Sequence, residues 1–320
     1  MTEAFRIEDR GDRRVLWVGD RPSISTHYSE RVIRMLIDRK GADRAPLYFP
    51  FKAERAPHFL GPLFRYLRGR RARGLRVLEV GCSFGHMTEY LAEQPEIAAI
   101  STFDPDEAFV EIARTKAKEL GLTVVNEILH LDQAATRTLP WADGAFDLVL
   151  AVGVVEHLPE RHRRAQVDEY WRVLAPQGHI AFLDTPNRYF PWETHSIGLP
   201  LVQWLPSRLA YSYARRWSRQ KDGQGGKLYR TISYETFIAD GTGWRNATRA
   251  ECLPSGGPAG VEDVTEAAGY GLRFFRDTVH SPRGRALLPA LRMAAGVLAT
   301  VGRSPSLALP YLNLLFRRAR

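Results

Sequence analysis

The chain has 320 residues and a formal net charge of +9, with 44% hydrophobic and 25% charged residues. This composition is typical of a globular protein and excludes disordered and fibrous classes. The positive charge suits nucleic acid, an anionic lipid surface or a phosphorylated substrate, without choosing among them. The only cysteines, Cys82 and Cys252, lack the paired spacing of a disulfide framework or zinc site, and residues 1–14 lack an apolar run of signal-peptide length. We therefore expect a cytoplasmic protein.

Residues 1–74 are predicted to be an N-terminal extension that caps the core. The hydrophobic pattern predicts a short strand over 13–19 and a helix over 28–38. Arginines then crowd into residues 65–76. This cluster is either a solvated helix end or an anion-binding site.

From residue 75 to about 190, short apolar runs alternate with amphipathic stretches, which is typical of parallel βαβ units. The predicted strands are 76–80, 98–103, 123–128, 146–152 and 178–184, and the predicted helices lie near 85–93, 106–120 and 161–173. This rhythm predicts an α/β fold, a Rossmann-like doubly wound and mostly parallel sheet with helices on both faces. The N-terminal and C-terminal additions are expected to form a cap.

Residues 191–285 are predicted to hold a substrate loop, a cap and the strands that close the sheet, near 228–232 and 272–279, with a helix over 261–269. Residues 286–320 are predicted to form amphipathic helices. Arg292 and Arg303 interrupt this tail, so it does not span a bilayer. It either packs as a helix pair or makes peripheral contact with the inner membrane surface.

Glycines and carboxylates follow the first predicted strands. Gly81 and Gly85 permit a tight strand-to-helix turn and close approach of a ligand to the main chain. Asp104 ends the next apolar run, where a carboxylate can accept hydrogen bonds from two ribose hydroxyls. Asp132, with Gln133 beside it, could accept from the exocyclic amine of adenine or cap a helix.

Several ordered motifs in residues 75–190 resemble class I S-adenosylmethionine-dependent methyltransferases, in particular bacterial small-molecule and glycan methyltransferases. The motifs are Val77 to Gly85, Phe103-Asp104-Pro105, Leu139-Pro140-Trp141, Phe146-Asp147-Leu148-Val149, Glu156-His157-Leu158 and Arg172 to Gly178. The last of these departs from the family pattern, because Gln177 stands where the family usually has glycine.

The resemblance implies S-adenosylmethionine as cofactor. It places Glu79 and Gly81 by the methionine end, Asp104 at the ribose and Asp132 near the adenine. The predicted cofactor-binding residues are Glu79, Gly81, Cys82, Ser83, Gly85, Asp104, Pro105, Asp132 and Gln133. A nicotinamide dinucleotide is the nearest rival, but its fingerprint requires glycine at the position of His86.

The sulfonium methyl is already activated, so no nucleophile or metal is required. A hydroxyl acceptor benefits from a base, and His157 and His195 are the candidates, with Glu193 placed to orient His195. Each histidine is alternatively a structural residue that shapes the pocket. A related subset that methylates polyprenyl phenols holds a metal through a Glu-His pair and an earlier glutamate. Gly153 occupies that earlier place here, so we expect no metal.

The leading hypothesis is O-methylation of a small molecule, glycan, lipid-linked intermediate or natural product. Methylation of RNA or protein is the second hypothesis, although the Asn/Asp-Pro-Pro-aromatic signature that serves planar amino groups is absent from residues 151–156. Nucleic acid is therefore a disfavoured partner. A scaffold that binds the cofactor without catalysis is the third.

Overall fold

A computed structural model describes residues 5–132, 134–221, 227–239, 244–279 and 282–319. The chain folds as two compact units, Met1–Thr136 and Arg137–Arg320. The boundary between them falls inside the span 75–190 that the sequence predicts to be one core.

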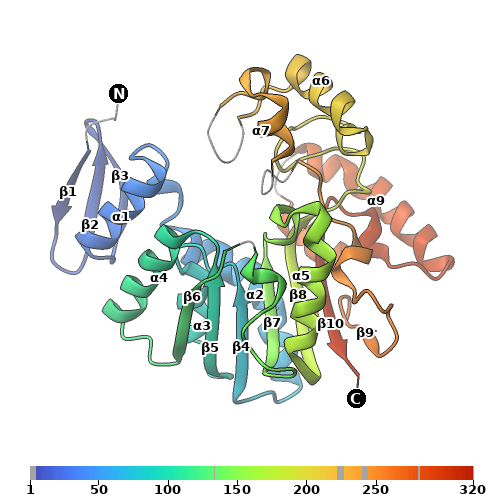
Figure 1. Ribbon diagram of the computed structural model, residues 1–320, viewed down its shortest axis with the longest axis horizontal. Helices are drawn as coiled ribbons and strands as arrows, with labels where there is room; N and C mark the ends of the chain where they lie inside the picture. The colour runs from blue at the N-terminus through green and yellow to red at the C-terminus, as the bar shows by residue number, and fades with distance from the viewer. Residues whose placement is uncertain (1–4, 133, 222–226, 240–243, 280–281, 320) are drawn as a thin grey trace. The chain divides into compact units, whose positions relative to one another are not determined.

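The first unit begins with a three-stranded antiparallel sheet (Figure 1). Its strands are β1 (Phe5–Asp9), β2 (Arg14–Val18) and β3 (Arg21–Thr26). Only β2 is predicted by the sequence. Helix α1 (Glu30–Lys40) follows, and the Ser29 side chain caps it by accepting a hydrogen bond from the Val32 amide.

The proline- and aromatic-rich segment after α1 forms a short 3-10 helix, η1 (Ala45–Leu47), and then a long helix, α2 (Phe51–Gly69). Helix α2 contains Pro57 and Pro62 and buries one apolar face, so tertiary packing overrides the local cost of proline. The arginine cluster begins at the end of α2. There Arg68 donates to Glu96 at 2.7 Å and to Gln94 at 2.9 Å, which supports the interpretation as a helix end whose charge is paired.

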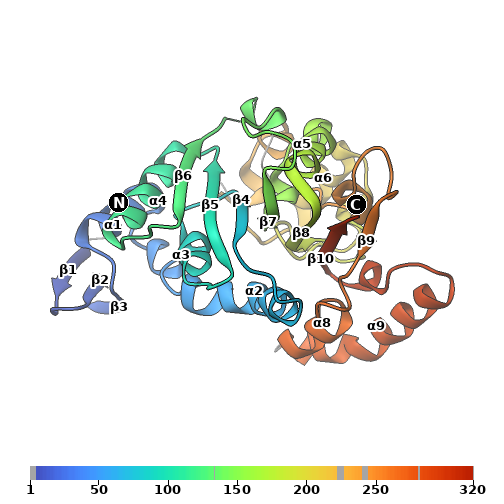
Figure 2. The same cartoon turned by 90° about the horizontal axis from the view of Figure 1, so that it is seen from below.

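Three parallel strands form the core of the first unit, in the order β6-β5-β4 (Figure 2). The core elements are β4 (Leu75–Val80), α3 (His86–Ala92), β5 (Ile97–Asp104), α4 (Glu107–Glu119) and β6 (Val125–His130). Helix α4 packs against β5 and β6. All five elements are predicted from the sequence to within a few residues, and η2 (Ala135–Arg137) follows them.

The core of the second unit is a four-stranded arrangement in the order β7-β8-β10-β9. Its elements are β7 (Phe146–Val152), η3 (Val155–His157), α5 (Glu160–Val173), β8 (Leu174–Pro186), β9 (Val261–Asp263) and β10 (Tyr311–Arg318). Strands β7 and β8 are parallel, whereas β10 runs antiparallel to both of its neighbours. With the parallel strands of the first unit, this confirms the predicted Rossmann-like, mostly parallel α/β fold.

Between β8 and β9 the second unit has a largely helical insert with an apolar cluster of its own. Its elements are η4 (Val202–Trp204), α6 (Ser207–Trp217), η5 (Tyr229–Thr231), α7 (Tyr234–Ile238) and η6 (Arg249–Cys252). Trp244 and Phe237 lie in this cluster with their ring centroids 4.8 Å apart. The insert is therefore packed structure rather than an open loop.

The predicted closing strands are wrong. Residues 228–232 form η5, residues 272–279 form helix α8 (Leu272–Thr278), and the predicted helix over 261–269 begins with strand β9. The actual closing strand is β10, whose register against β8 is fixed over most of its length. Both segments mix apolar with charged or hydroxyl side chains over a few positions, and a pattern this short fits a helical turn as well as a strand.

Residues 286–320 are predicted to form amphipathic helices. The structure has a helix there, α9 (Pro282–Thr300), which leaves Leu287, Met293 and Val297 exposed, and it has a strand instead of a helix at the end of the chain. After η7 (Pro305–Ala308), Leu314, Leu315 and Phe316 are fully buried in β10, so these side chains do not form an interfacial helix. Nowhere in the described residues does a helix combine the length and apolar character needed to cross a membrane.

Gln177, the departure from the family pattern, adopts a left-handed conformation with φ of 66° near the start of β8. Glycine is the usual residue there because it adopts this conformation without strain. The Gln177 side chain accepts a hydrogen bond from Arg317 of β10, which gives the side chain a role that glycine lacks.

Candidate functional site

The turn between β4 and α3 is shaped by a run of left-handed residues. Gly81, Ser83 and Gly85 have φ angles of 75°, 49° and 78°. A Cβ on Gly85 would lie 3.1 Å from Cβ of Ala113 on α4, so both conformation and space favour glycine. The predicted tight strand-to-helix turn is therefore confirmed, whereas close approach of a ligand to its main chain stays a prediction.

Asp104, at the end of β5, lies directly against this turn. One carboxylate oxygen accepts from the Ser83 amide at 2.8 Å, and the other accepts from the Asp106 amide at 2.9 Å. Burial raises the pKa of Asp104, and the two amide hydrogen bonds oppose that rise. Each carboxylate oxygen has the capacity to accept a second hydrogen bond, so the residue fits a ribose diol.

Glu79 is 4% exposed, and its carboxyl accepts from the Thr88 hydroxyl at 2.5 Å. Burial raises the pKa of Glu79 to about 8. The predicted partner of this carboxyl, the methionine end of the cofactor, carries an ammonium group. A nearby positive charge would favour the ionised form of Glu79 and lower its pKa.

The remaining predicted cofactor residues differ in what their side chains do. Cys82 packs in an apolar cluster with Val110 and Ile128, so its side chain serves the core. Pro105 is exposed. Asp132 is exposed and accepts from the amides of Ala134 and Ala135 at 2.8 and 2.7 Å, the helix-cap geometry that the sequence left open. Gln133 lies outside the described residues.

His86, the residue that argued against a dinucleotide fingerprint, is half-buried at the start of α3. Its ring stacks on Phe84 with centroids 4.8 Å apart and an interplanar angle of 22°. Burial lowers the pKa of His86 to about 3, so the ring is neutral near pH 7. It supports the turn through packing.

A buried ionic network lies beside the turn and was not predicted from the sequence. The Glu89 carboxylate of α3 accepts from the Tyr28 hydroxyl at 2.7 Å and pairs with Lys116 of α4 at 3.1 Å. It also lies 3.3 Å from Lys52 of α2 and 3.3 Å from His27. The network thus connects the N-terminal extension to α3. This helix follows the turn between β4 and α3, which is called the cofactor turn below because the cofactor is predicted to bind there.

Lys116 is only 1% exposed, and burial lowers its pKa to about 8. Its ammonium group lies 4.3 Å from the centre of the Tyr28 ring and 5.0 Å from that of Phe84. The hydrogen bonds and charges around Glu89 hold the pKa of that carboxyl far below its usual range despite burial. The pair is therefore ionised at neutral pH.

In the second unit, the two candidate bases lie next to each other. The ring centroids of His157 and His195 are 5.2 Å apart with an interplanar angle of 62°. Glu156 is 2% exposed, and its Oε1 lies 3.9 Å from Nε2 of His157. The sequence predicts each histidine as a separate candidate base. It does not predict Glu156 as a site residue, although Glu156 directly precedes His157.

Glu193 is fully buried and organises the loop that carries His195. Its two carboxylate oxygens accept from four consecutive main-chain amides, those of residues 195–198, at 2.6 to 2.9 Å. The carboxylate therefore positions His195 through the loop main chain. The sequence predicts that Glu193 orients His195, and in the structure the hydrogen bonds of this carboxylate are with the loop main chain.

Arg163 of α5 fixes the segment that carries Glu156 and His157. It is 2% exposed and donates to the carbonyls of Glu156 and Leu158, each at 3.2 Å. It also pairs with Glu251 of the insert at 3.3 Å. Arg188 also pairs with Glu251, and with Glu160 as well; its guanidinium lies 3.4 Å from each of these carboxylates.

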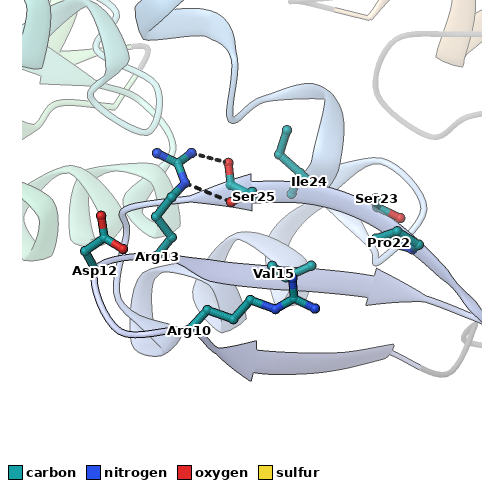
Figure 3. A pocket seen from close by; sticks show the side chains of 8 residues that line it. All are labelled: Arg10, Asp12, Arg13, Val15, Pro22, Ser23, Ile24 and Ser25. Atoms are coloured by element: carbon teal, nitrogen blue, oxygen red, sulfur yellow. Dashed lines mark hydrogen bonds between the residues drawn. The ribbon is translucent and has the colours of Figure 1, made fainter.

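A separate hollow occurs on the β1–β3 sheet (Figure 3). Within it, Arg13 donates to the Ser25 side chain and main-chain carbonyl, both at 2.8 Å. None of the predicted site residues lines this hollow. Both of its arginines are engaged within the sheet, Arg13 with Ser25 and Arg10 with the Glu8 carboxylate, so the hollow adds nothing to the candidate site.

The comparisons with known proteins agree with the motifs. Residues 77–178 match the family model described as a methyltransferase domain. The ubiquinone biosynthesis O-methyltransferase of Histophilus somni is 28% identical over 149 residues, 45% of this chain and 60% of that protein. Methyltransferase GfsG of Streptomyces halstedii is 32% identical over 111 residues, 35% of this chain and 38% of that protein. Norajmaline N-methyltransferase of Rauvolfia serpentina is 33% identical over 113 residues, 35% of this chain and 36% of that protein.

The chain spans 60%, 38% and 36% of the lengths of these three relatives. The fold, the motifs and the family match agree that residues 77–178 are a methyltransferase domain of the class I S-adenosylmethionine-dependent type. Its cofactor is S-adenosylmethionine, and the residues of the cofactor turn fit that molecule.

Proposed function

We propose that this protein transfers the methyl group of S-adenosylmethionine to a hydroxyl oxygen of a small molecule, glycan, lipid-linked intermediate or natural product. The observation that carries the proposal is the contact between His157 and His195 beside the buried Glu156. Two imidazoles side by side provide the proton-handling groups that an alcohol or phenol needs and that an already nucleophilic amine does not.

The bound cofactor supplies a methyl group activated by the positive sulfur. The protein holds the acceptor hydroxyl and removes its proton. The oxygen lone pair forms the new O–C bond, the C–S bond breaks with its electrons left on sulfur, and the hydroxyl proton passes to an imidazole or to water. Exclusion of competing water and alignment of the acceptor supply the remaining rate enhancement.

The acceptor class is supported by aromatic residues of the segment after β8. Tyr189, Trp192 and Trp204 are 57%, 51% and 51% exposed, and the Trp204 indole donates to the Arg188 carbonyl at 2.5 Å. Exposed aromatic faces bind apolar rings and the apolar faces of sugars. An arginine in this segment could bind a phosphate, but the Arg188 guanidinium is engaged with Glu160, Glu251 and the Asn246 carbonyl. A neutral acceptor is therefore favoured.

The names of the relatives include both oxygen and nitrogen acceptors. The test is incubation of the full chain with methyl-labelled S-adenosylmethionine and matched acceptor pairs, each a phenol or alcohol with the corresponding amine. Products are measured by mass spectrometry. We expect label on the hydroxyl compounds. Label only on amines, on RNA or on protein would contradict the proposal.

Calorimetric titration with S-adenosylmethionine accompanies this assay. Cofactor binding without turnover of any acceptor would favour the scaffold hypothesis. Absence of cofactor binding would contradict the assignment of the turn between β4 and α3 as the cofactor site.

A further inference from the structure

Lys116 of α4 is a buried cation that contacts the cofactor turn. Its ammonium group donates to the Gly85 carbonyl at 3.4 Å and lies 5.0 Å from the centre of the Phe84 ring. The same carbonyl accepts from the Glu89 amide at 3.1 Å, which begins the hydrogen-bonded ladder of α3. Lys116 is only 1% exposed, so water competes little for these contacts. It therefore fixes the point at which the turn becomes a helix.

The position of the Lys116 ammonium group is set by two other buried side chains. The Glu89 carboxylate lies 3.1 Å from it and also accepts from the Tyr28 hydroxyl at 2.7 Å. The Tyr28 ring centre lies 4.3 Å from the ammonium group. A buried polar network whose members are all engaged makes its surroundings rigid. Because Tyr28 belongs to the N-terminal extension, that extension contributes to the shape of the cofactor turn.

The charge of Lys116 also acts on Glu79, the carboxyl that is predicted to bind the ammonium group of the cofactor. Burial and the Asp104 carboxylate oppose ionisation of Glu79, whereas the Thr88 hydroxyl and Lys116 favour it. The Cys82 thiol, whose own pKa is raised by burial, also faces Glu79. An ionised carboxylate binds an ammonium group more strongly than a neutral carboxyl does. Loss of the Lys116 charge should therefore raise the pKa of Glu79 further and weaken cofactor binding at neutral pH.

We propose that Lys116 is a positioning residue for S-adenosylmethionine: it holds the Gly85 end of the cofactor turn, and its charge favours the form of Glu79 that binds the ammonium group of the cofactor. Lys116 acts through these two residues and is not itself a cofactor ligand. The inference concerns cofactor binding alone, so it does not depend on which acceptor atom is methylated.

The test compares the affinities of the full chain and its variants for S-adenosylhomocysteine, the demethylated cofactor, which keeps the ammonium group. Dissociation constants are measured by calorimetric titration at pH 7 and pH 9. K116M should bind about tenfold more weakly than the wild type at pH 7, and this difference should narrow to about threefold at pH 9. Titration of the ligand itself affects both proteins equally and cancels in the ratio.

The difference should narrow for two reasons. Rising pH ionises Glu79 in both proteins, so the charge of Lys116 is no longer needed for that step. In addition, burial lowers the pKa of Lys116 to about 8, and the wild type itself loses this charge at pH 9. The charged groups that act on Lys116 are Glu89, Glu79 and Lys52. The remaining threefold difference is the lost hydrogen bond to the Gly85 carbonyl.

Two further variants separate this role from a loss of folding stability. K116M leaves Glu89 buried without its closest cation, so K116M/E89Q repeats the measurement in a protein that lacks this unpaired charge. Its affinity at pH 7 should be reduced to a similar extent. The matched control is K118M, the same substitution at an exposed position of α4, which should bind as the wild type does. Thermal unfolding of each variant reports its fold.

An affinity ratio between K116M and the wild type that falls from pH 7 to pH 9 supports the proposal. An equal ratio at both pH values would show that Lys116 only stabilises the fold and would overturn it. Wild-type affinity in K116M/E89Q would overturn it as well, as would absence of S-adenosylhomocysteine binding by the wild type. None of these titrations contains an acceptor, so failure of the proposed hydroxyl methylation would leave their outcome unchanged.

Discussion

The two groups of candidate functional residues, one in each unit, are built in different ways. The cofactor turn consists of main chain from a short stretch, and Asp104 follows at the end of the next strand. The imidazole cluster consists of side chains from two distant segments, η3 and the loop after β8. Within each group, neighbouring parallel strands end at the same edge of the sheet, but the position of His195 also depends on how the loop after β8 folds around Glu193. Variants at the turn or at Asp104 should change cofactor affinity, whereas variants at the histidines should change turnover.

The largest effect is expected at the buried pair beside the turn. Replacing Lys116 with Met leaves Glu89 buried without its closest cation, and breaking a buried pair in this way costs about 3 to 5 kcal/mol. Urea denaturation of the wild type and variant measures the change. The double variant K116M/E89Q is the control and should recover part of the loss. An unchanged midpoint for K116M would mean that Lys52 and His27 suffice to stabilise Glu89.

Glu79 should give the next largest effect, visible as a pH dependence. Its folded pKa of about 8 lies above the ordinary value of 4.5. Between these pH values the unfolded chain releases the proton and the folded protein keeps it, so the wild type loses stability as the pH rises. E79Q should therefore gain about 3 kcal/mol relative to wild type between pH 4.5 and pH 8. Parallel denaturation curves at several pH values measure the difference, and a constant difference would show that Glu79 is ionised in the folded state.

His195 should separate turnover from cofactor binding. H195A is expected to lower kcat by about 100-fold, the smaller end of what a proton-handling group contributes, because it removes one of the two adjoining imidazoles. Affinity for S-adenosylmethionine should stay within twofold, since its predicted ligands lie elsewhere in the sequence. The H162A variant serves as control with normal kcat. Normal turnover in H195A would remove this residue from the chemistry.

A change at Asp104 should have the converse effect, a loss of affinity for S-adenosylmethionine. D104A removes the carboxylate that adjoins the turn, and the loss of two hydrogen bonds to a charged group should weaken S-adenosylmethionine binding by about 10- to 100-fold. Calorimetric titration gives the dissociation constant, and D104N should retain part of the affinity because its side-chain oxygen still accepts. Unchanged affinity in D104A would mean that the ribose lies elsewhere.

The sequence alone was sufficient for the βαβ core and for the cofactor turn. Strands that are buried on both faces read as apolar runs, and left-handed turns require glycine, so both leave local signals at Val77 to Gly85 and at Asp104. The adjacency of turn and carboxylate follows because neighbouring parallel strands end at the same edge of the sheet. Their roles as cofactor ligands stay predictions.

Tertiary structure decided the rest. Residues 311–318 form a buried strand because they pair with the edge of β8. No periodic pattern within these residues predicts that pairing. Likewise, Glu193 folds its loop through main-chain amides, and the contact of His195 with His157 depends on how this loop folds after β8. Short-range patterns encode which element a segment forms. Contacts between side chains far apart in sequence depend on the packing of the whole unit, so only the folded chain reveals them.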